Sequence, residues 1–307
     1  MKNILPHLHG VAGLAVAGLM PHVFADTLFS DNFDTDTSAN WNVLWNANTT
    51  LSSAPDYQLQ WAYDYSVLGI PAAPGSDGTT RGLRIDVNKD DVGAQIAVAL
   101  FPQNQSFSGS YSLKFDMWMN YPATGNTTEH AWFGINTTGT RANRIVNDGG
   151  SDGILFAITG EGGSSGTSTT ARDYSVYFGN PAGRPALQTA LSLDNADAIP
   201  KATFPASGHP YGFEGTPGMK WTEVEVRYEN NTVSLLLDGV TFTTFANTTA
   251  FTEGNIQIGY NDVFASISPE GTFMVYDNVR VEVIPEPSTV ALGLLGLGLL
   301  GLARRRA

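Results

Sequence analysis

Apolar and polar residues alternate along most of the chain between residues 26 and 284. In the clearest stretch, Leu113, Phe115, Met117 and Met119 occupy every second position. A period of two with one apolar face is typical of half-buried strands in antiparallel sheets. The pattern predicts strands near 28–33, 42–51, 57–64, 81–88, 93–101, 109–120, 129–137, 153–159, 173–179, 221–229, 232–238, 240–246, 254–260 and 271–283.

Turn and helix signals agree with an all-β fold. Asp238-Gly239 lies between two apolar runs, which predicts a β-hairpin. No stretch between residues 26 and 180 has convincing helical periodicity, and residues 185–193 are a weak helix candidate that begins at a proline. The number of predicted strands is larger than a small barrel contains, and it fits a two-sheet antiparallel sandwich of the jelly-roll kind.

Two segments interrupt the alternation. Residues 139–171 include a tract rich in Gly, Ser and Thr, which indicates a loop. Residues 180–220 contain six prolines and few alternating positions. A connection of this length is either a surface excursion packed on the sandwich or a functional segment, and the sequence leaves both interpretations open.

The N-terminal end has the features of a secretory signal peptide. Lys2 supplies a positive charge, an apolar run follows at 10–20, and Val23 and Ala25 are the small residues that precede a cleavage site before Asp26. The alternative is an N-terminal membrane anchor, but that needs about 20 apolar residues. We therefore predict that residues 1–25 are removed and that residues 26–284 form the body.

The C-terminal end holds the most specific motif in the sequence. Its parts, in order, are Pro285, Glu286, Pro287, an apolar run at 290–303, Arg304, Arg305 and Arg306. A short apolar helix with a basic cluster on its cytoplasmic side suits transient anchoring in a membrane. The alternative is a plain C-terminal anchor.

This C-terminal arrangement resembles the PEP-CTERM sorting signal of Gram-negative bacteria. The resemblance covers residues 285–307 and implies processing by an exosortase-type enzyme during export. It also implies transient anchoring in the inner membrane, followed by delivery to the cell surface or to the extracellular matrix of a biofilm or floc.

Composition narrows the functions that remain. The chain has no cysteine, which excludes disulfides, thiolate nucleophiles and cysteine-bound metals. Asp and Glu outnumber Lys and Arg by 29 to 16, and an acidic protein does not suit the neutralisation of nucleic-acid phosphates. An acidic body suits solubility outside the cell, and it offers oxygen ligands for calcium.

Several motifs of the body resemble the concanavalin A-like lectins and glucanases, particularly their laminin G-like branch. The matching segments are the strand that begins at Trp221, the next strand ending at Asp238-Gly239, the closing runs 254–260 and 273–281, and the opening 31–34 with Trp41 downstream. The resemblance implies a concanavalin-like sandwich over about residues 28–283. It does not imply an activity, because one sandwich fold hosts unrelated functions.

A catalytic site is not recognisable in the sequence. Glucanases of the resembled superfamily carry Glu-x-Asp-x-x-Glu on one strand, whereas Glu223, Glu225 and Glu229 have the last carboxylate one residue too far. We also cannot nominate two carboxylates that face each other across a cleft, as glycoside hydrolysis requires. The sequence therefore predicts a protein that is not an enzyme, with a glycan-cleaving enzyme of unrecognised site as an alternative.

Acidic residues near the two ends of the body suggest a structural calcium ion. Asp31, Asp34 and Asp36 cluster near its start, and Asp277 lies in its last predicted strand. In sandwiches of this type the first and last strands tend to be neighbours, and hard oxygen ligands suit calcium. The alternative, which we favour, is that these aspartates cap turns and bind backbone groups.

Carbohydrate binding is the sharper hypothesis for the body. If the apolar positions of 112–120 face the core, Trp118 faces away from it between two hydrogen-bonding side chains, as a sugar platform requires. The same parity extends the platform to a neighbouring strand. The six candidate residues are Asp116, Trp118, Asn120, His130, Trp132 and Asn136. The opposite parity would bury the tryptophans, and Tyr211 with Phe213 forms a second aromatic candidate.

Together these observations predict an exported surface or matrix protein. We expect it to bind exopolysaccharide non-covalently, as an adhesion protein of a biofilm or floc. A purely structural matrix protein without a sugar site is the rival interpretation.

Overall fold

A computed structural model describes residues 26–47, 56–90, 95–122, 129–146, 149–162, 172–264 and 267–285. The predicted signal peptide, the C-terminal apolar run and the three terminal arginines lie outside these residues. Within the described ranges, no helix combines the length and the apolar composition that crossing a bilayer requires.

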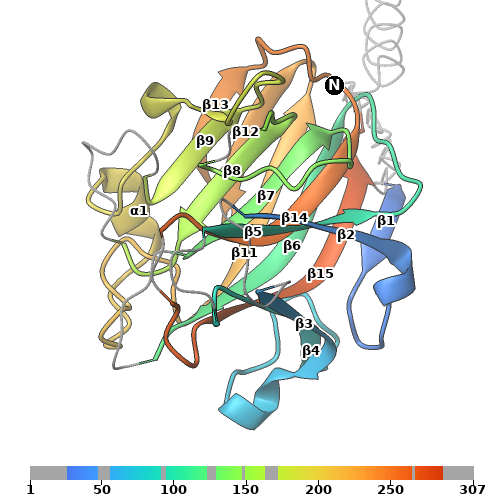
Figure 1. The fold of residues 1–307 in the computed structure, drawn as a ribbon. Coiled ribbons are helices and arrows are strands. Elements are labelled where there is room, and N and C mark those ends of the chain that lie inside the picture. The colour runs from blue at the N-terminus through green and yellow to red at the C-terminus, as the bar shows by residue number, and fades with distance from the viewer. Residues whose placement is uncertain are drawn as a thin grey trace, which may run out of the picture.

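Two antiparallel sheets pack face to face in the body (Figure 1). The strands are β1 (Thr27–Asp31), β2 (Trp41–Ala47), β3 (Tyr57–Asp64), β4 (Arg81–Val87), β5 (Ile96–Pro102), β6 (Tyr111–Asn120), β7 (Glu129–Thr137), β8 (Ile154–Thr159), β9 (Tyr174–Phe178), β10 (Ala186–Leu187), β11 (Trp221–Glu229), β12 (Thr232–Leu237), β13 (Val240–Ala246), β14 (Asn255–Asp262) and β15 (Phe273–Val283). Sheet A has the order β13-β12-β11-β6-β15-β4-β3, with β1 also paired to β15. Sheet B has the order β10-β9-β8-β7-β14-β5-β2. The predicted all-β sandwich is confirmed.

Local signals were right for the hairpin and wrong for the helix. Asp238 and Gly239 join β12 to β13 with positive φ at both residues, 48° and 75°, as a primed two-residue turn requires. The predicted helix at 185–193 is wrong, because β10 pairs with the edge of β9 there and only a short 3-10 turn, η3 (Thr189–Leu191), follows. The described α-helix of the excursion is α1 (Ala198–Thr203).

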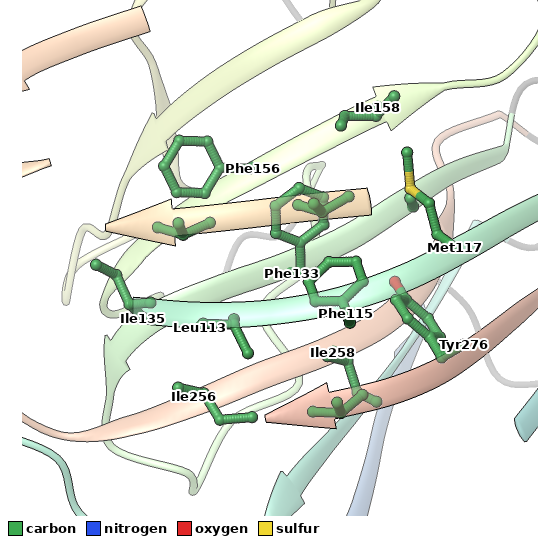
Figure 2. Packing of buried hydrophobic residues seen from close by; sticks show 14 of the residues in the cluster. Leu113, Phe115, Met117, Phe133, Ile135, Phe156, Ile158, Ile256, Ile258 and Tyr276 are labelled. Atoms are coloured by element: carbon green, nitrogen blue, oxygen red, sulfur yellow. The ribbon is translucent and has the colours of Figure 1, made fainter. Parts of the chain in front are cut away.

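The core lies between the two sheets and is built by the alternation that the sequence displays. Figure 2 shows part of it, with Leu113, Phe115, Met117, Phe133, Ile135, Phe156, Ile158, Ile256, Ile258 and Tyr276 pointing inward. Two tyrosines of sheet A also reach sheet B: Tyr276 Oη donates to Gly259 O at 2.6 Å, and Tyr111 Oη donates to Asn136 Oδ1 at 2.6 Å. These bonds satisfy hydroxyls that would be costly to bury alone.

Strand β15 is flanked by two different strands along one of its edges. Met274–Tyr276 pair with β4, and Val279–Glu282 pair with β1, while β6 runs along the other edge. Between the two partners, at Asp277 and Asn278, the register shifts and Asn278 takes a positive φ of 52°. We call this interruption of the sheet edge the notch.

Connecting segments cover the outer faces of both sheets. On sheet A, Tyr65 and Ile70 pack on Trp118, Phe273 and Val275. On sheet B, Ile145 packs on Trp132, whose Nε1 donates to Asn143 O. Side chains on the outer faces are therefore far more buried than alternation alone suggests.

Candidate functional site

The notch opens into a polar cleft of about 550 Å³. Its lining consists of Ser30, Asp31, Asn32, Thr37, Asn40, Gly75, Asn278, Val279 and Arg280. These residues come from β1 and the turn after it, from the β3–β4 connection, and from the bulge of β15. Most of them offer hydrogen-bond donors or acceptors, and the volume falls in the range of roughly 300–1,000 Å³ that is typical of small-ligand sites.

Two carboxyl groups face each other beneath this cleft. Asp277 on β15 is the register partner of Asp116 on β6, and both side chains are fully buried. Asp116 Oδ2 accepts hydrogen bonds from Gly75 N at 3.0 Å and from Asn278 Nδ2 at 2.8 Å. Like charges placed opposite each other at such a site cannot both be ionised without a large cost.

The buried position changes the protonation of this pair. Burial raises the pKa of Asp277 from 3.8 to about 7, against the hydrogen bonds from Tyr65 and Asn278, and the nearby Asp116 and Asp34 raise it further. Burial also raises the pKa of Asp116, opposed by the hydrogen bonds from Asn278 and Gly75. The pair therefore holds a proton under mildly acidic conditions.

The surroundings of Tyr65 fit a protonated Asp277. Tyr65 Oη lies 3.0 Å from Asp277 Oδ2 and 3.2 Å from Thr79 O, and it accepts from Ala73 N at 3.2 Å. One hydroxyl hydrogen cannot serve both acceptors. A proton on Asp277 resolves the conflict, because Oδ2 then donates to Tyr65 while Tyr65 donates to Thr79 O.

Within the part of the chain that the structure describes, several buried oxygen atoms around the notch have no hydrogen-bond partner. They are Thr37 Oγ1, Asp34 Oδ1 and Asp116 Oδ1. The exposed side chain of Asn40 also lines the cleft. Buried polar atoms are almost always satisfied by protein or ordered water, so these atoms indicate a cleft that receives hydrogen-bonding molecules from solvent.

The predicted platform residues of β6 face away from the core, as the alternation suggests, but Trp118 is not a free surface. Its side chain is 8% exposed and lies 5.8 Å from the ring of Trp221. Its Nε1 donates to Asn120 Oδ1 at 3.2 Å, and Asn120 Nδ2 donates to Gly271 O. Asp116 is the member of this set that reaches the notch.

The other three predicted platform residues belong to sheet B and do not join the first three. His130 and Trp132 are buried on β7, under the segment that packs on its outer face. Asn136 has a positive φ of 55° where the pairing of β7 with β14 shifts register, and its amide turns inward to Tyr111. The platform cannot extend from β6 to β7, because the two strands belong to different sheets, and the bulge turns Asn136 away from the face of His130 and Trp132.

The predicted calcium ligands do not form one ligand set. β1 and β15 are neighbours, as expected, but Asp31 accepts from Phe33 N at 2.9 Å and from Trp41 Nε1 at 2.8 Å. Asp36 is exposed and accepts from Ser38 N, and Asp34 accepts from Asn32. Among the described residues, no three Asp, Glu or His side chains could hold a metal ion together. These residues do not fit calcium, and turn capping explains them.

The run that comes nearest to a glucanase motif lies on the outer face of sheet A. Glu225 is 2.8 Å from Arg227 Nε and 3.8 Å from Lys114 Nζ, and Glu223 is 3.6 Å from Arg280. These carboxylates are thus engaged in ion pairs, Glu225 in a largely buried one and Glu223 in an exposed one, which stabilises the sheet weakly.

Sequence reasoning missed most of the residues that shape the notch. Tyr65, Gly75, Asn40 and Arg280 carry no recognisable motif, and Gly75 is needed because a Cβ would lie 2.7 Å from Asp116 Oδ2. Asn278 had one usable signal: an Asn after an Asp in an otherwise alternating strand is a residue that tolerates positive φ, and so marks a bulge.

Comparison with known proteins identifies the C-terminal segment. Residues 283–307 match the PEP-CTERM protein-sorting motif, which indicates export and sorting across a membrane. No curated protein matches the sequence.

Solved structures with similar sheets include lectin-like proteins and hydrolases. A Bacillus subtilis protein of unknown function with a galectin-like fold has a TM-score of 0.44 and 8% identity, covering 85% of this chain and 98% of its own. A β-1,3-glucanase from Mycobacterium marinum has a TM-score of 0.43 and 10% identity, covering 83% and 98%. The Emp46p carbohydrate recognition domain has a TM-score of 0.41 and 11% identity, covering 74% and 87%. Resemblances this loose assign neither a ligand nor an activity.

Proposed function

We propose that the protein is exported to the cell surface or extracellular matrix and binds exopolysaccharide there without cleaving it. The notch is the proposed site. Removal of residues 1–25 and processing near Pro285 by an exosortase-type enzyme would release a body, residues 26–284, that carries this cleft.

The observation that carries the proposal is the convergence of polar groups on one cleft. Thr37 Oγ1 has no hydrogen-bond partner among the described residues, the exposed amide of Asn40 lines the cleft, and Arg280, which also donates to Glu282 and to Asn278 O, adds guanidinium donors. Sugar hydroxyls donate and accept at once, so they match a lining of amides, hydroxyls and one guanidinium. The acidic composition of the chain favours a neutral glycan over an anionic one.

Affinity electrophoresis of the full chain tests this proposal. Gels would contain exopolysaccharide from the producing cells, and migration would be compared with and without the polymer. The double variant Asn40→Ala, Asn278→Gly removes two amides of the cleft while glycine keeps the positive φ of residue 278. We expect at least a tenfold loss of affinity in this variant.

Asn42→Ala is the matched control, because Asn42 is an exposed asparagine on β2 that does not line the cleft. Wild-type retardation that persists unchanged in the double variant would remove the notch from the proposal. A wild-type chain that no polysaccharide retards would instead support the purely structural matrix protein.

A glycan-cleaving enzyme is the second candidate, and the Asp116–Asp277 pair favours it. A buried carboxyl group with a pKa of about 7 has the protonation of a general acid near neutral pH. Release of reducing ends from the same polysaccharides would detect such an activity. If turnover occurs and Asp277→Asn abolishes it, the non-enzymatic proposal is wrong.

A further inference from the structure

The long excursion between β9 and β11 contains a rigid turn at residues 207–213, which we call the aromatic turn. Ser207 N donates to Gly212 O at 2.8 Å, and Gly212 N donates to His209 O at 2.9 Å. A Cβ at Gly212 would lie 1.7 Å from Ser207 Oγ, so a larger residue there would have to displace the Ser207 hydroxyl. Thr216 also binds Phe213 O through its backbone N and its hydroxyl. The turn is therefore preorganised before any ligand arrives.

Aromatic rings form a continuous series from the core to the surface of this turn. The buried ring of Tyr121 lies 6.4 Å from that of Tyr211, which lies 6.4 Å from Phe213 at an interplanar angle of 89°. The imidazole of His209 lies 6.1 Å from Tyr211. Phe213 is 51% exposed, although a large apolar ring on a fixed turn gains nothing from contact with water.

Polar groups surround these rings in a defined orientation. His209 Nδ1 accepts a hydrogen bond from Tyr211 N at 3.1 Å. In the neutral imidazole the ring hydrogen must then be on Nε2, which is a donor directed away from the turn. Within the described part of the chain, Tyr211 Oη has no protein partner, and the exposed carboxylate of Glu214 follows Phe213 directly.

The aromatic turn lies at the opposite end of the sandwich from Pro285, where the Pro-Glu-Pro motif begins. Tyr121 directly follows β6, whose last residue pairs with Phe273 at the start of β15. The motif follows Val283 at the other end of β15, where Val283 N donates to Asp26 O. Eleven strand residues span about 35 Å. The aromatic turn and the start of the sorting motif are thus separated by about the length of β15.

We propose that the aromatic turn is a second carbohydrate-binding site, distinct from the notch, for a neutral pyranose. The apolar C–H face of the sugar stacks on the exposed ring of Phe213, the perpendicular ring of Tyr211 bounds the site edge-on, and the sugar hydroxyls meet His209 Nε2–H and Tyr211 Oη. Glu214 accepts further hydroxyls and repels anionic sugars. Stacking rings combined with a few fixed polar groups are the chemistry that discriminates a pyranose from a purely apolar partner.

Affinity electrophoresis of the full chain tests this site with neutral polymers: hydroxyethylcellulose, laminarin, xylan and galactomannan. We expect at least one to retard the wild type, and the double variant Tyr211→Ala, Phe213→Ala to weaken that binding at least tenfold. Tyr211→Phe keeps the ring and should lose about threefold. Phe264→Ala is the control, since Phe264 is a similarly exposed phenylalanine, 54%, in another loop.

The outcomes separate this site from the notch. Loss of binding in the Tyr211/Phe213 variant, with binding retained in the Asn40/Asn278 variant, supports the aromatic turn as a site separate from the notch, whose own test is the exopolysaccharide of the producing cells. Unchanged binding in the Tyr211/Phe213 variant overturns the aromatic turn even if the notch variant fails to bind. A wild type that none of the four polymers retards also overturns it. Thermal unfolding of each variant confirms that the fold is intact.

Discussion

At the scale of single residues, Asp277 makes stability depend on pH. Its pKa is about 7 in the folded chain and 3.8 when unperturbed, so between these values the folded state binds a proton that the unfolded state has released. The stabilisation is complete below pH 4 and is lost as the pH rises through 7. Asp277→Asn mimics the protonated acid and should gain up to about 4 kcal/mol relative to wild type between pH 4 and pH 8.

Urea unfolding of both chains at pH 4, 6 and 8 measures this difference. Asp116 and Glu129 also have raised pKa values, so the wild type loses stability with pH through several groups. The comparison isolates the Asp116–Asp277 pair, because Glu129 and the other groups are common to both chains. If the free energy of unfolding changed with pH by the same amount in both chains, the folded state would not raise the pKa of Asp277, and the carboxylate would be ionised in the folded protein.

Trp118 is a residue whose structural contribution must be separated from any role in binding. Its ring is 8% exposed and packs on Trp221 and Tyr65. Trp118→Ala should lower the free energy of unfolding by about 3 kcal/mol, because it empties a packed site. Trp45→Ala, at a ring that is 41% exposed on β2, should cost about 1 kcal/mol. Equal losses in urea unfolding would contradict the buried role of Trp118.

At the scale of elements, the β12–β13 hairpin allows backbone strain to be measured alone. Gly239 has a φ of 75°, and a Cβ there would meet nothing within 4 Å. Gly239→Ala should therefore cost about 1 kcal/mol, the price of left-handed backbone in an alanine. Gly239→Asn should cost less, because asparagine tolerates that conformation. Equal losses for the two variants in thermal unfolding would rule out this explanation.

Strands were predictable from the sequence, and their irregularities were not. Alternation at 111–120 places the core residues correctly, because one face of the strand packs on the opposite sheet. The bulges at Asn136 and Asn278 cannot be recognised from the apolar content of their strands, yet each changes the direction in which the polar side chains of its strand point. The helix predicted at 185–193 failed because pairing with β9, a contact distant in sequence from that segment, determined its structure.

At the scale of the molecule, the candidate site depends on contacts between segments far apart in the chain. The notch combines Asp31, Gly75, Asp116 and Asn278, which belong to four different elements or loops. The expectation that the first and last strands are neighbours predicted one of these contacts. The other contacts of the notch are made by loops that fold over sheet A. The alternation of apolar and polar residues along the chain does not indicate which loop covers which face of a sheet.

The whole body should be independent of both terminal segments. β15 ends at Val283, and the last backbone bond of the body joins Ile284 N to Ser110 O at 3.0 Å. A chain of residues 26–284 therefore keeps every strand, and its unfolding temperature should match that of the full chain within about 2 °C. A chain ending at residue 278 loses the pairing of β1 with β15 and should not fold. A 26–284 chain that fails to fold would show that the terminal segments are part of the fold.

Mass spectrometry of exported protein should give a species that begins at Asp26 and ends near Pro285, because we expect both terminal segments to be removed during export. An exported mass that extends to Ala307 would contradict processing at the motif.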